Sequence, residues 1–349
     1  MHPVPIVSGL FDEFLTETPP RNHSYQISNP VRLLVLTLNF LWRTLLSPYD
    51  TSAPINPNCL STNPSQQNVL FPSLISAIES SIVWDSVYFV RIAECGYEYE
   101  QTYAFFPLLP LCMSMLSRTV LAPLVPVIGQ RAVLGLSGYV INNIGFMFAA
   151  VYLYRLSVVI LDHEAAVRAS ILFCFNPASI FYSSMLGFSS ALYCKYSETL
   201  FALFSVGGLY HLISGKDVIA VLWFALSGFS RSNGVLNAGY FCFQTMHQTY
   251  DAVFLRKHPF VENHNLKARN QVNKDGPALI SEERKLSAKR GYLSVAVLPC
   301  ILHLGFMAAA AFFVMHVQVA TRFLSFSPPL YWFASYIMKP VALVKDGDI

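Results

Sequence analysis

Long apolar runs, separated by short polar breaks, occupy most of the chain from residue 31 onward. There are seven such runs, each of roughly 17–30 residues, the length a helix needs to cross a hydrocarbon core about 30 Å thick. The pattern therefore predicts an all-α integral membrane protein with multiple spans. The predicted spans are Val31–Leu46, Ala104–Val127, Ala132–Leu161, Ala165–Tyr193, Tyr196–Ile213, Val218–Tyr240 and Gly291–Val317.

Three of the runs carry residues that break helices. The second run contains four prolines, so we expect a helix that is broken or kinked at both ends. The fourth run is interrupted at Asn176, which precedes a proline, and the sixth is interrupted at 231–234. If each run crosses the membrane once, the chain has seven spans. If the fourth or the sixth run is instead a pair of half-helices, the number of crossings changes from odd to even.

The composition excludes a soluble globular protein. Hydrophobic side chains make up 54% of the chain and charged ones 12%, whereas soluble domains carry roughly 25% charged residues. The mean hydropathy is +0.45. The formal net charge of +3 is small, and the basic residues cluster in one loop, so no nucleic-acid partner is expected.

The basic residues predict an orientation in the membrane. Loop 245–290 holds nine Lys and Arg residues, and loop 47–103 holds a single arginine among six acids. The positive-inside rule places the first loop in the cytosol and the second in the lumen. We therefore expect a cytosolic tail 1–30, a multispan module 31–244 that includes the luminal loop, a cytosolic loop 245–290, and a further span and tail in 291–349. No cleavable signal peptide is evident, so the first span would act as an uncleaved anchor.

A short amphipathic stretch in the luminal loop carries the first candidate. Asp85 follows Trp84, and Tyr88 lies one helical turn further along on the same face. A carboxylate partly withdrawn from water beside a bulky indole is suited to act as a general base. The alternative is a solvated loop acid next to an interfacial tryptophan. Arg91 lies on roughly the opposite side, where it either holds a phosphate or pairs with Glu94.

Two further groups of candidates lie at the edges of apolar runs. Phe105 and Phe106 either contact a substrate or belong to an interfacial belt of aromatic side chains. Tyr196 and Glu198 begin another run. An ionisable group at membrane depth is costly and so marks a functional site, which makes Glu198 a candidate.

The interruption at 231–234 carries the last group. Arg231 and Asn233 place a permanent cation and an amide within an apolar run. A guanidinium held near the bilayer is a natural ligand for a lipid phosphate. The alternative is that Arg231 extends to the interface. Asn142 and Asn143, in the middle of a span, are expected to hydrogen-bond to a neighbouring helix.

The cysteines and the absent motifs limit the chemistry. Cys59 and Cys95 share the luminal loop and could form a disulfide, while the other cysteines read as small apolar residues of buried helices. The sequence has no CxxC pair, no metal-ligand spacing and no nucleotide-binding motif. If the protein is a transferase, a lipid-linked donor therefore fits a multispan enzyme better than a sugar nucleotide. No cofactor and no metal site are expected, although a metal requirement stays open.

Several short motifs, each weak by itself, follow one another in a fixed order. They are Val83-Trp84-Asp85 with Tyr88-Phe89, Ile92-Ala93-Glu94 with Gly96-Tyr97, Phe105-Phe106-Pro107, Phe175-Asn176-Pro177-Ala178, Tyr196-Ser197-Glu198 and Arg231-Ser232-Asn233-Gly234. Together they resemble the glycosylphosphatidylinositol (GPI) mannosyltransferase II family, which adds the second mannose of the GPI anchor core. The resemblance runs from the first span to about residue 245 and resumes near Pro328-Pro329-Leu330-Tyr331-Trp332-Phe333.

The resemblance implies a GT-C type multispan fold in the endoplasmic reticulum membrane, with a helical first loop and an active site in the lumen. It implies dolichyl-phosphate mannose as the donor and a mannosyl-glucosaminyl-phosphatidylinositol GPI precursor as the acceptor. The new bond would be α-1,6, formed with inversion. A small membrane partner subunit is compatible with this expectation.

The resemblance also suggests roles for the candidates. Asp85 matches the acid of the first luminal loop and would be the base for the acceptor hydroxyl, because inversion needs one base and no covalent intermediate. Arg231 and Arg91 would stabilise the phosphate that leaves. Glu198, with Tyr196 and Asn233 beside the site, would orient the acceptor. Trp84, Phe105 and Phe106 would stack on sugar or dolichol.

Two departures from the family pattern favour alternatives. About ten residues, 186–195, look inserted before Tyr196, and a short charged tail begins at Lys339 where relatives continue with more transmembrane helix. An alternative or truncated isoform is therefore expected, which puts the activity of the chain in question. The rival interpretations are an inactive isoform or partner subunit of the enzyme, and a lipid or solute transporter that uses Arg231 and Glu198 within the membrane.

Overall fold

The computed structural model describes residues 59, 70–79, 82, 85–176, 197–254, 291–314 and 324–338. Within these ranges the chain is helical and contains no strand, which confirms the all-α class for this part of the molecule. Some predicted features fall outside the described residues. They are the tail 1–30, the span Val31–Leu46, Trp84, Tyr196, the insertion 186–195 and the tail from Lys339.

The α-helices are α3 (Pro72–Glu79), α4 (Asp85–Cys95), α5 (Leu108–Arg118), α6 (Val125–Ile128), α7 (Gln130–Ile160), α8 (His163–Phe175), α10 (Glu198–Ile213), α11 (Asp217–Ser230), α12 (Ala238–Phe254), α15 (Leu298–Val314) and α17 (Pro328–Ile337). Short 3₁₀ turns join some of them, namely η1 (Glu100–Ala104), η2 (Ala122–Leu124), η3 (Ser232–Asn237), η5 (Gly291–Leu293) and η6 (Val295–Val297). Two helices, α3 and α4, lie within the first loop, as the sequence predicts.

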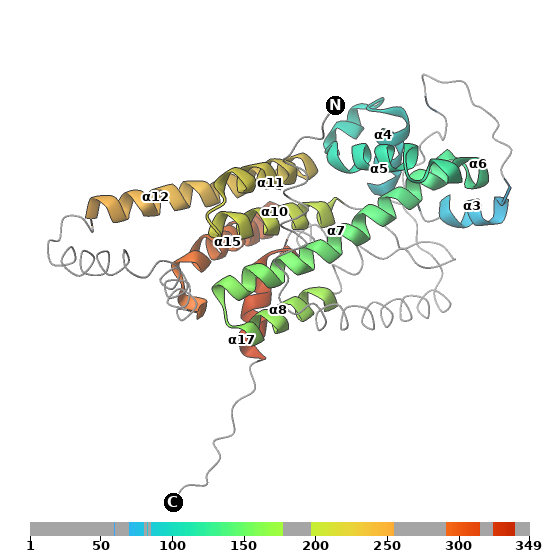
Figure 1. Ribbon diagram of the computed structural model, residues 1–349. Helices are drawn as coiled ribbons and strands as arrows, with labels where there is room; N and C mark the ends of the chain where they lie inside the picture. The colour runs from blue at the N-terminus through green and yellow to red at the C-terminus, as the bar shows by residue number, and fades with distance from the viewer. Residues whose placement is uncertain are drawn as a thin grey trace, which may run out of the picture.

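Helix α7 is the axis around which the others pack (Figure 1). It is 31 residues long and contacts α3, α4, α5, α6, α8 and α10. The helices of the first loop, together with α5 and α6, gather at one end of α7, and α8 with α17 packs along its other half. The end of α7 is followed directly by α8, whose cap Asp162 accepts a hydrogen bond from the Ala165 amide at 3.1 Å.

Two adjacent glycines allow α11 to lie close against α10. A Cβ atom at Gly207 would come within 2.3 Å of the Trp223 ring, and one at Gly208 within 2.6 Å of the Phe224 ring. Small residues at helix contacts are typical of bundles in membranes, where close van der Waals packing replaces the hydrophobic effect between helices. The α10–α11 pair is therefore a tight unit.

The predicted interruptions are confirmed where the structure describes them. The proline-rich run is broken into α5 and the η2–α6 segment, which are bent by 70° relative to each other. Helix α8 ends at Phe175, next to Asn176. Helix α11 ends at Ser230, and η3 separates it from α12.

The number of crossings is supported only in part. By length and hydropathy, two helical segments of the described residues can span a membrane, 130–160 and 295–313, and the bent α5–α6 pair would be a third. Helices α10 and α11 are apolar but have 16 and 14 residues. Helix α12 continues to Phe254, so the predicted cytosolic loop 245–290 begins as a helix rather than as a loop.

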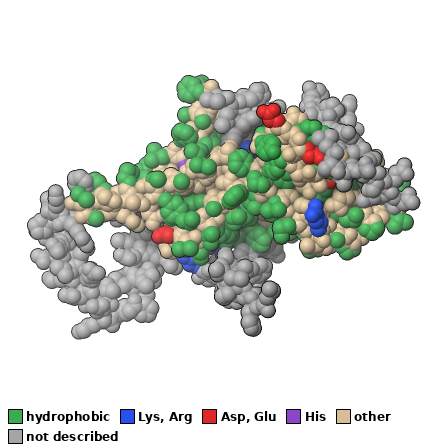
Figure 2. All heavy atoms as spheres, turned by 90° about the horizontal axis from the view of Figure 1, so that it is seen from above, with side chains coloured by type: hydrophobic (Ala, Val, Ile, Leu, Met, Phe, Trp, Pro, Cys, Tyr) green, Lys and Arg blue, Asp and Glu red, His purple; other side chains and the backbone are tan. Residues whose placement is uncertain are grey.

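The outer surface of the bundle is rich in apolar side chains. Figure 2 shows them spread over the upper face, with charged side chains few and scattered. Phe312 and Phe313 on α15 are 83% and 80% exposed, and Val218 on α11 is 76% exposed. Such exposure is unfavourable in water and is expected where helices face lipid. The described residues therefore belong to a helical membrane protein.

Candidate functional site

The acid expected to act as a base lies at the start of a helix. Asp85 is the first residue of α4 and is half-buried. The N–H groups at the start of a helix favour a negative charge at this position. Tyr88, one turn along, stacks on Phe105 with 4.7 Å between the ring centroids. The structure thus places Phe105 beside the face that carries Asp85, and the half-buried Phe106 follows it.

Arg91 points into the protein. Its side chain is 1% exposed and its Nη2 atom lies 2.5 Å from the carboxylate of Glu98. Helical spacing predicted Glu94 as the alternative partner, but the chain reverses at Gly96, where φ is +79°, and brings Glu98 back over the helix. The burial favours a structural role for Arg91 over the predicted role as a phosphate ligand.

Glu94, the second acid of α4, is partly withdrawn from water. Burial raises the pKa of Glu94, although Arg131 at the start of α7 and Arg91 act in the opposite direction. One carboxylate oxygen of Glu94 is buried without a hydrogen-bond partner. The two acids of α4 therefore differ in position. Asp85 is the first residue of the helix, whereas Glu94 lies near its other end with one buried carboxylate oxygen.

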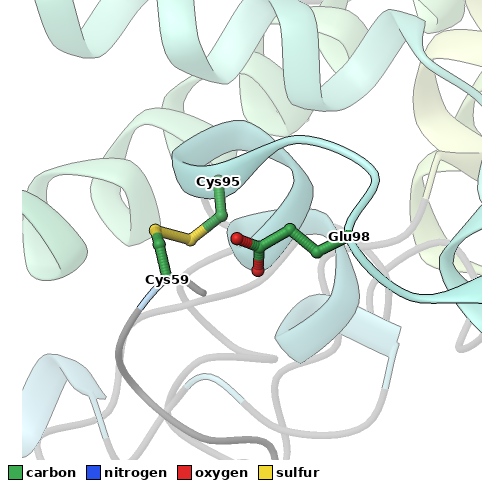
Figure 3. A group of neighbouring side chains, drawn as sticks. All are labelled: Cys59, Cys95 and Glu98. Carbon is green, nitrogen blue, oxygen red and sulfur yellow. A yellow bond between two sulfur atoms is a disulfide. The ribbon is translucent and has the colours of Figure 1, made fainter. Parts of the chain in front are cut away.

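A disulfide fixes the end of α4. Cys59 and Cys95 are bonded, with 5.5 Å between their Cα atoms, which confirms the pairing that the sequence left open. Glu98 lies beside the two sulfur atoms (Figure 3). Thiolates, not disulfide sulfurs, ligate metals. Because Cys59 and Cys95 are bonded to each other, these two residues and Glu98 do not form a metal site. Among the other described cysteines, Cys112, Cys242 and Cys300 are free thiols.

An apolar cluster joins α4 to the start of α10. It contains Phe89 and Val90 of α4, Leu109 and Met113 of α5, and Leu200 of α10. Phe105 packs against the same cluster. Because Leu200 lies two residues after Glu198, the cluster brings the segment that carries Asp85 towards the segment that carries Glu198.

Two candidates that are far apart in the sequence form an ion pair. Arg231, at the end of α11, donates to Glu198, at the start of α10. Their side chains are 19% and 2% exposed, and the second carboxylate oxygen of Glu198 is buried without a hydrogen-bond partner. A buried charge is tolerated only when it is paired. The sequence indicated both residues as candidates but did not predict that they pair.

The turn after α11 folds back onto the α10–α11 pair. Asn237 donates to the hydroxyls of Ser205 and Ser227, both at 3.0 Å, and these two hydroxyls lie 2.7 Å apart. A Cβ atom at Gly234 would lie 2.5 Å from the backbone of α11 at Ser227. These contacts hold η3, and with it Asn233, in one position. Sequence reasoning missed Asn237, because its partners lie 10 and 32 residues away.

Two motifs of the sequence meet in space. Asn176, at the end of α8, donates to the Tyr331 hydroxyl and to the Ser325 carbonyl. In α17, Trp332 is 1% exposed and donates to Ser157 of α7 at 2.8 Å. The Asn-Pro motif and the Pro-Pro-Leu-Tyr-Trp motif are therefore parts of one junction that anchors α17 to the bundle.

The geometry defines a helical membrane protein in which an apolar cluster links the segment of the Glu198–Arg231 pair to the segment that carries the half-buried acid Asp85. The family model described as Mannosyltransferase (PIG-V) matches residues 24–268 and 272–346. The match covers most of the chain, so the chain belongs to this family. The family predicted from the motifs is confirmed.

Individual relatives agree with the family. The chain is 31% identical over 210 residues to the GPI alpha-1,6-mannosyltransferase 2 of Mus musculus, a match that covers 60% of the chain and 39% of the relative. It is 31% identical over 226 residues to the protein of the same name from Homo sapiens, covering 64% and 42%. It is 34% identical over 184 residues to the GPI mannosyltransferase 2 of Drosophila pseudoobscura pseudoobscura, covering 50% and 38%.

The matched region is only part of these relatives. The chain spans about two fifths of the length of the mammalian relatives it matches. No solved structure matches the chain.

The disulfide should contribute to the stability of the first loop. Cys95→Ser should lower the thermal unfolding temperature of the purified protein, because a disulfide typically contributes about 2–4 kcal/mol. Cys59→Ser should have the same effect, and the double substitution should add little to either. Cys242→Ser, which removes an exposed free thiol, is the control. The bond would be contradicted if the denatured wild-type protein had the same number of alkylated thiols with and without reductant.

Gly234 should be intolerant of any side chain. Gly234→Ala should destabilise the protein by about 1–3 kcal/mol, because the new methyl group meets the backbone of α11 rather than a movable side chain. The matched control is Gly239→Ala in α12, where a Cβ atom has no neighbour within 4 Å. Thermal unfolding in detergent compares the two variants. Equal unfolding temperatures would show that η3 does not dock on α11 in this way.

The Glu198–Arg231 pair should behave as a buried ion pair. Arg231→Met leaves Glu198 unpaired and should cost about 3–5 kcal/mol, whereas Glu198→Gln combined with Arg231→Met should recover much of the loss. The control is Arg168→Met, which breaks an exposed pair with Glu164 and should cost less than about 1 kcal/mol. A double-mutant cycle of unfolding measurements gives the coupling, and additive losses would contradict the pairing.

Proposed function

We propose that this chain carries the site of a GPI mannosyltransferase, which transfers mannose in α-1,6 linkage from dolichyl-phosphate mannose to the mannosyl-glucosaminyl-phosphatidylinositol precursor. The observation that carries the proposal is membership in the PIG-V family, with relatives named GPI alpha-1,6-mannosyltransferase 2. The position of Asp85 as the half-buried first residue of α4 supports it further.

Asp85 would act as the general base. Transfer from a β-linked donor to an α-linked product inverts the anomeric centre, and inversion needs one base and no covalent intermediate. The Asp85 carboxylate accepts the proton of the acceptor hydroxyl as the oxygen attacks the anomeric carbon. The bond from that carbon to the phosphate oxygen breaks, and dolichyl phosphate leaves without a general acid.

Arg231 would stabilise the departing phosphate. A guanidinium offers five N–H donors in a fixed plane, and a carboxylate partner sets the direction in which that plane faces. The buried Glu198 supplies such a partner. Negative charge grows on the phosphate in the transition state, so a pre-oriented cation lowers the barrier. Trp84, Phe105 and Phe106 are proposed to stack on sugar or dolichol, and Tyr196 and Asn233 to flank the acceptor.

The proposed location is the endoplasmic reticulum membrane, in a multi-pass GT-C type fold with the site in the lumen. The Cys59–Cys95 disulfide supports the luminal position of the first loop, because disulfides persist in oxidising compartments. The contrast between the single arginine of that loop and the nine basic residues of loop 245–290 supports the same orientation. A small membrane subunit is a further proposed partner.

Asp85→Asn should abolish the activity. In a cell line that lacks transfer of the second GPI mannose, the wild-type chain should restore GPI proteins at the surface. The variant should lower mannose transfer in microsomes by about 10²–10⁴-fold, the usual contribution of a general base.

Asp217→Asn is the control, because Asp217 is also the first residue of a helix, α11, and is exposed. It should transfer mannose like the wild type at equal expression. Equal rescue by Asp85→Asn and the wild type would exclude Asp85 as the base. Absence of transfer by the wild-type chain would favour the inactive-isoform or partner-subunit interpretation. Lipid movement across vesicles without transfer would favour a transporter.

A further inference from the structure

A small cavity lies next to the Glu198–Arg231 pair. It is enclosed by α10, the η3–α12 junction, α15 and the segment 324–328. Phe201, one turn after Glu198 on α10, lines the cavity, and so does Asn233, two residues after Arg231. The cavity therefore borders the site proposed for the phosphate, although neither member of the ion pair lines it.

The polar lining of this cavity is uncommon for the interior of an apolar bundle. No Asp, Glu, Lys or Arg side chain of the described residues lines it. The polar lining residues are Ser205, Asn233, Asn237, Tyr240, His303 and Ser327. Tyr240 and His303 are hydrogen-bonded to each other at 2.8 Å. Uncharged polar groups in such a place must find partners, because each unpaired buried group is costly.

Asn237 presents one unused acceptor. Its side chain is fully buried, and its amide nitrogen donates to Ser205 and Ser227. These two bonds fix the orientation of the amide, and the carbonyl oxygen is left buried with no hydrogen-bond partner. The oxygen is held by the α10–α11 pair before any ligand arrives, which lowers the entropic cost of binding.

Asn233 presents a second unused acceptor. Its Oδ1 atom is also buried and has no hydrogen-bond partner. Asn233 and Asn237, on neighbouring turns, both line the cavity. Acceptors repel a phosphate oxygen and bind a group that donates, and a sugar hydroxyl is such a group.

The size of the cavity limits the ligand. Its volume is about 40 Å³, and one buried water molecule needs roughly 10–15 Å³ on the same measure. A hydroxyl or hydroxymethyl group fits into this space, whereas an isoprenoid or acyl chain does not. The segment 324–328 that closes the cavity is fixed through the Tyr331–Asn176 junction.

We infer that this cavity is a hydroxyl-recognition subsite for the saccharide of a lipid-linked substrate, with Asn237 and Asn233 as specificity-determining residues. The inference rests on the proposed transferase function. A sugar hydroxyl donates to the Asn237 carbonyl oxygen while the neighbouring phosphate lies towards Arg231. The hydroxyl belongs either to the sugar of the donor or to that of the acceptor, and the same chemistry serves both.

The test combines variants with deoxy substrates. The purified full chain is assayed with a synthetic mannosyl phosphate lipid and a synthetic mannosyl-glucosaminyl-inositol phospholipid, each prepared as the parent and as single-deoxy analogues. In the wild type, one analogue should lose about two- to tenfold in kcat/KM, the usual value of one neutral hydrogen bond. In Asn237→Leu that penalty should disappear, because the parent falls to the level of the analogue.

Further variants keep the result decisive. Asn233→Leu retains the bonds of Asn237 to Ser205 and Ser227, so it serves if Asn237→Leu does not fold. Asn143→Leu, the same change on α7 and outside the cavity, should retain the penalty. The series that shows the effect, donor or acceptor, identifies the source of the hydroxyl. Deoxy penalties that stay unchanged in both cavity variants would overturn the inference.

Failure of the proposed function gives a different result. If the wild type transfers no mannose, the same comparison is made by thermal stabilisation of the chain with the parent and deoxy lipids. A deoxy penalty in binding that Asn237→Leu or Asn233→Leu removes would support the subsite without the transferase. Equal stabilisation of wild type and both variants by every lipid would overturn it.

Discussion

The buried pair of Glu198 and Arg231 is the constraint on which the candidate site depends. Two charges withdrawn from water are stable only when they face each other at short range. Their pairing requires α10 to begin, and α11 to end, at the same level of the bundle. Because α11 ends at Ser230, the guanidinium of Arg231 can reach the carboxylate of Glu198 within an otherwise apolar pair of helices.

The break is held open by packing rather than by flexibility. Gly234 allows η3 to touch the backbone of α11, and Asn237 ties the same turn to Ser205 and Ser227. Freed backbone groups at membrane depth are tolerated only where protein covers them. The contacts that satisfy this requirement also fix the position of Asn233 and orient the side-chain amide of Asn237, and both residues line the adjoining cavity. One arrangement thus answers a structural need and shapes a polar site.

The sequence predicts the features that have local causes. Prolines broke the 104–127 run, Asn176 and Arg231 marked helix ends, and the first loop contained helices. Pairings over long sequence separations could not be read from spacing. Arg91 forms its ion pair with Glu98 rather than with Glu94, because the chain reverses at Gly96. Neither the Glu198–Arg231 pair nor the contacts of Asn237 follow any helical period, since they arise only when α10 and α11 pack.

The C-terminal described segment extends this dependence across the molecule. Residues 324–328 close the cavity, and they lead directly into α17. Trp332 joins α17 to α7, Ser335 joins it to the Ala165 carbonyl in α8, and Tyr331 joins it to Asn176. The cavity wall is therefore positioned by contacts on the opposite side of the bundle from α11. A shift of α17 relative to α7 and α8 would therefore move residues 324–328, which line the cavity together with Asn233 and Asn237. The Glu198–Arg231 pair does not line the cavity and would not be displaced directly.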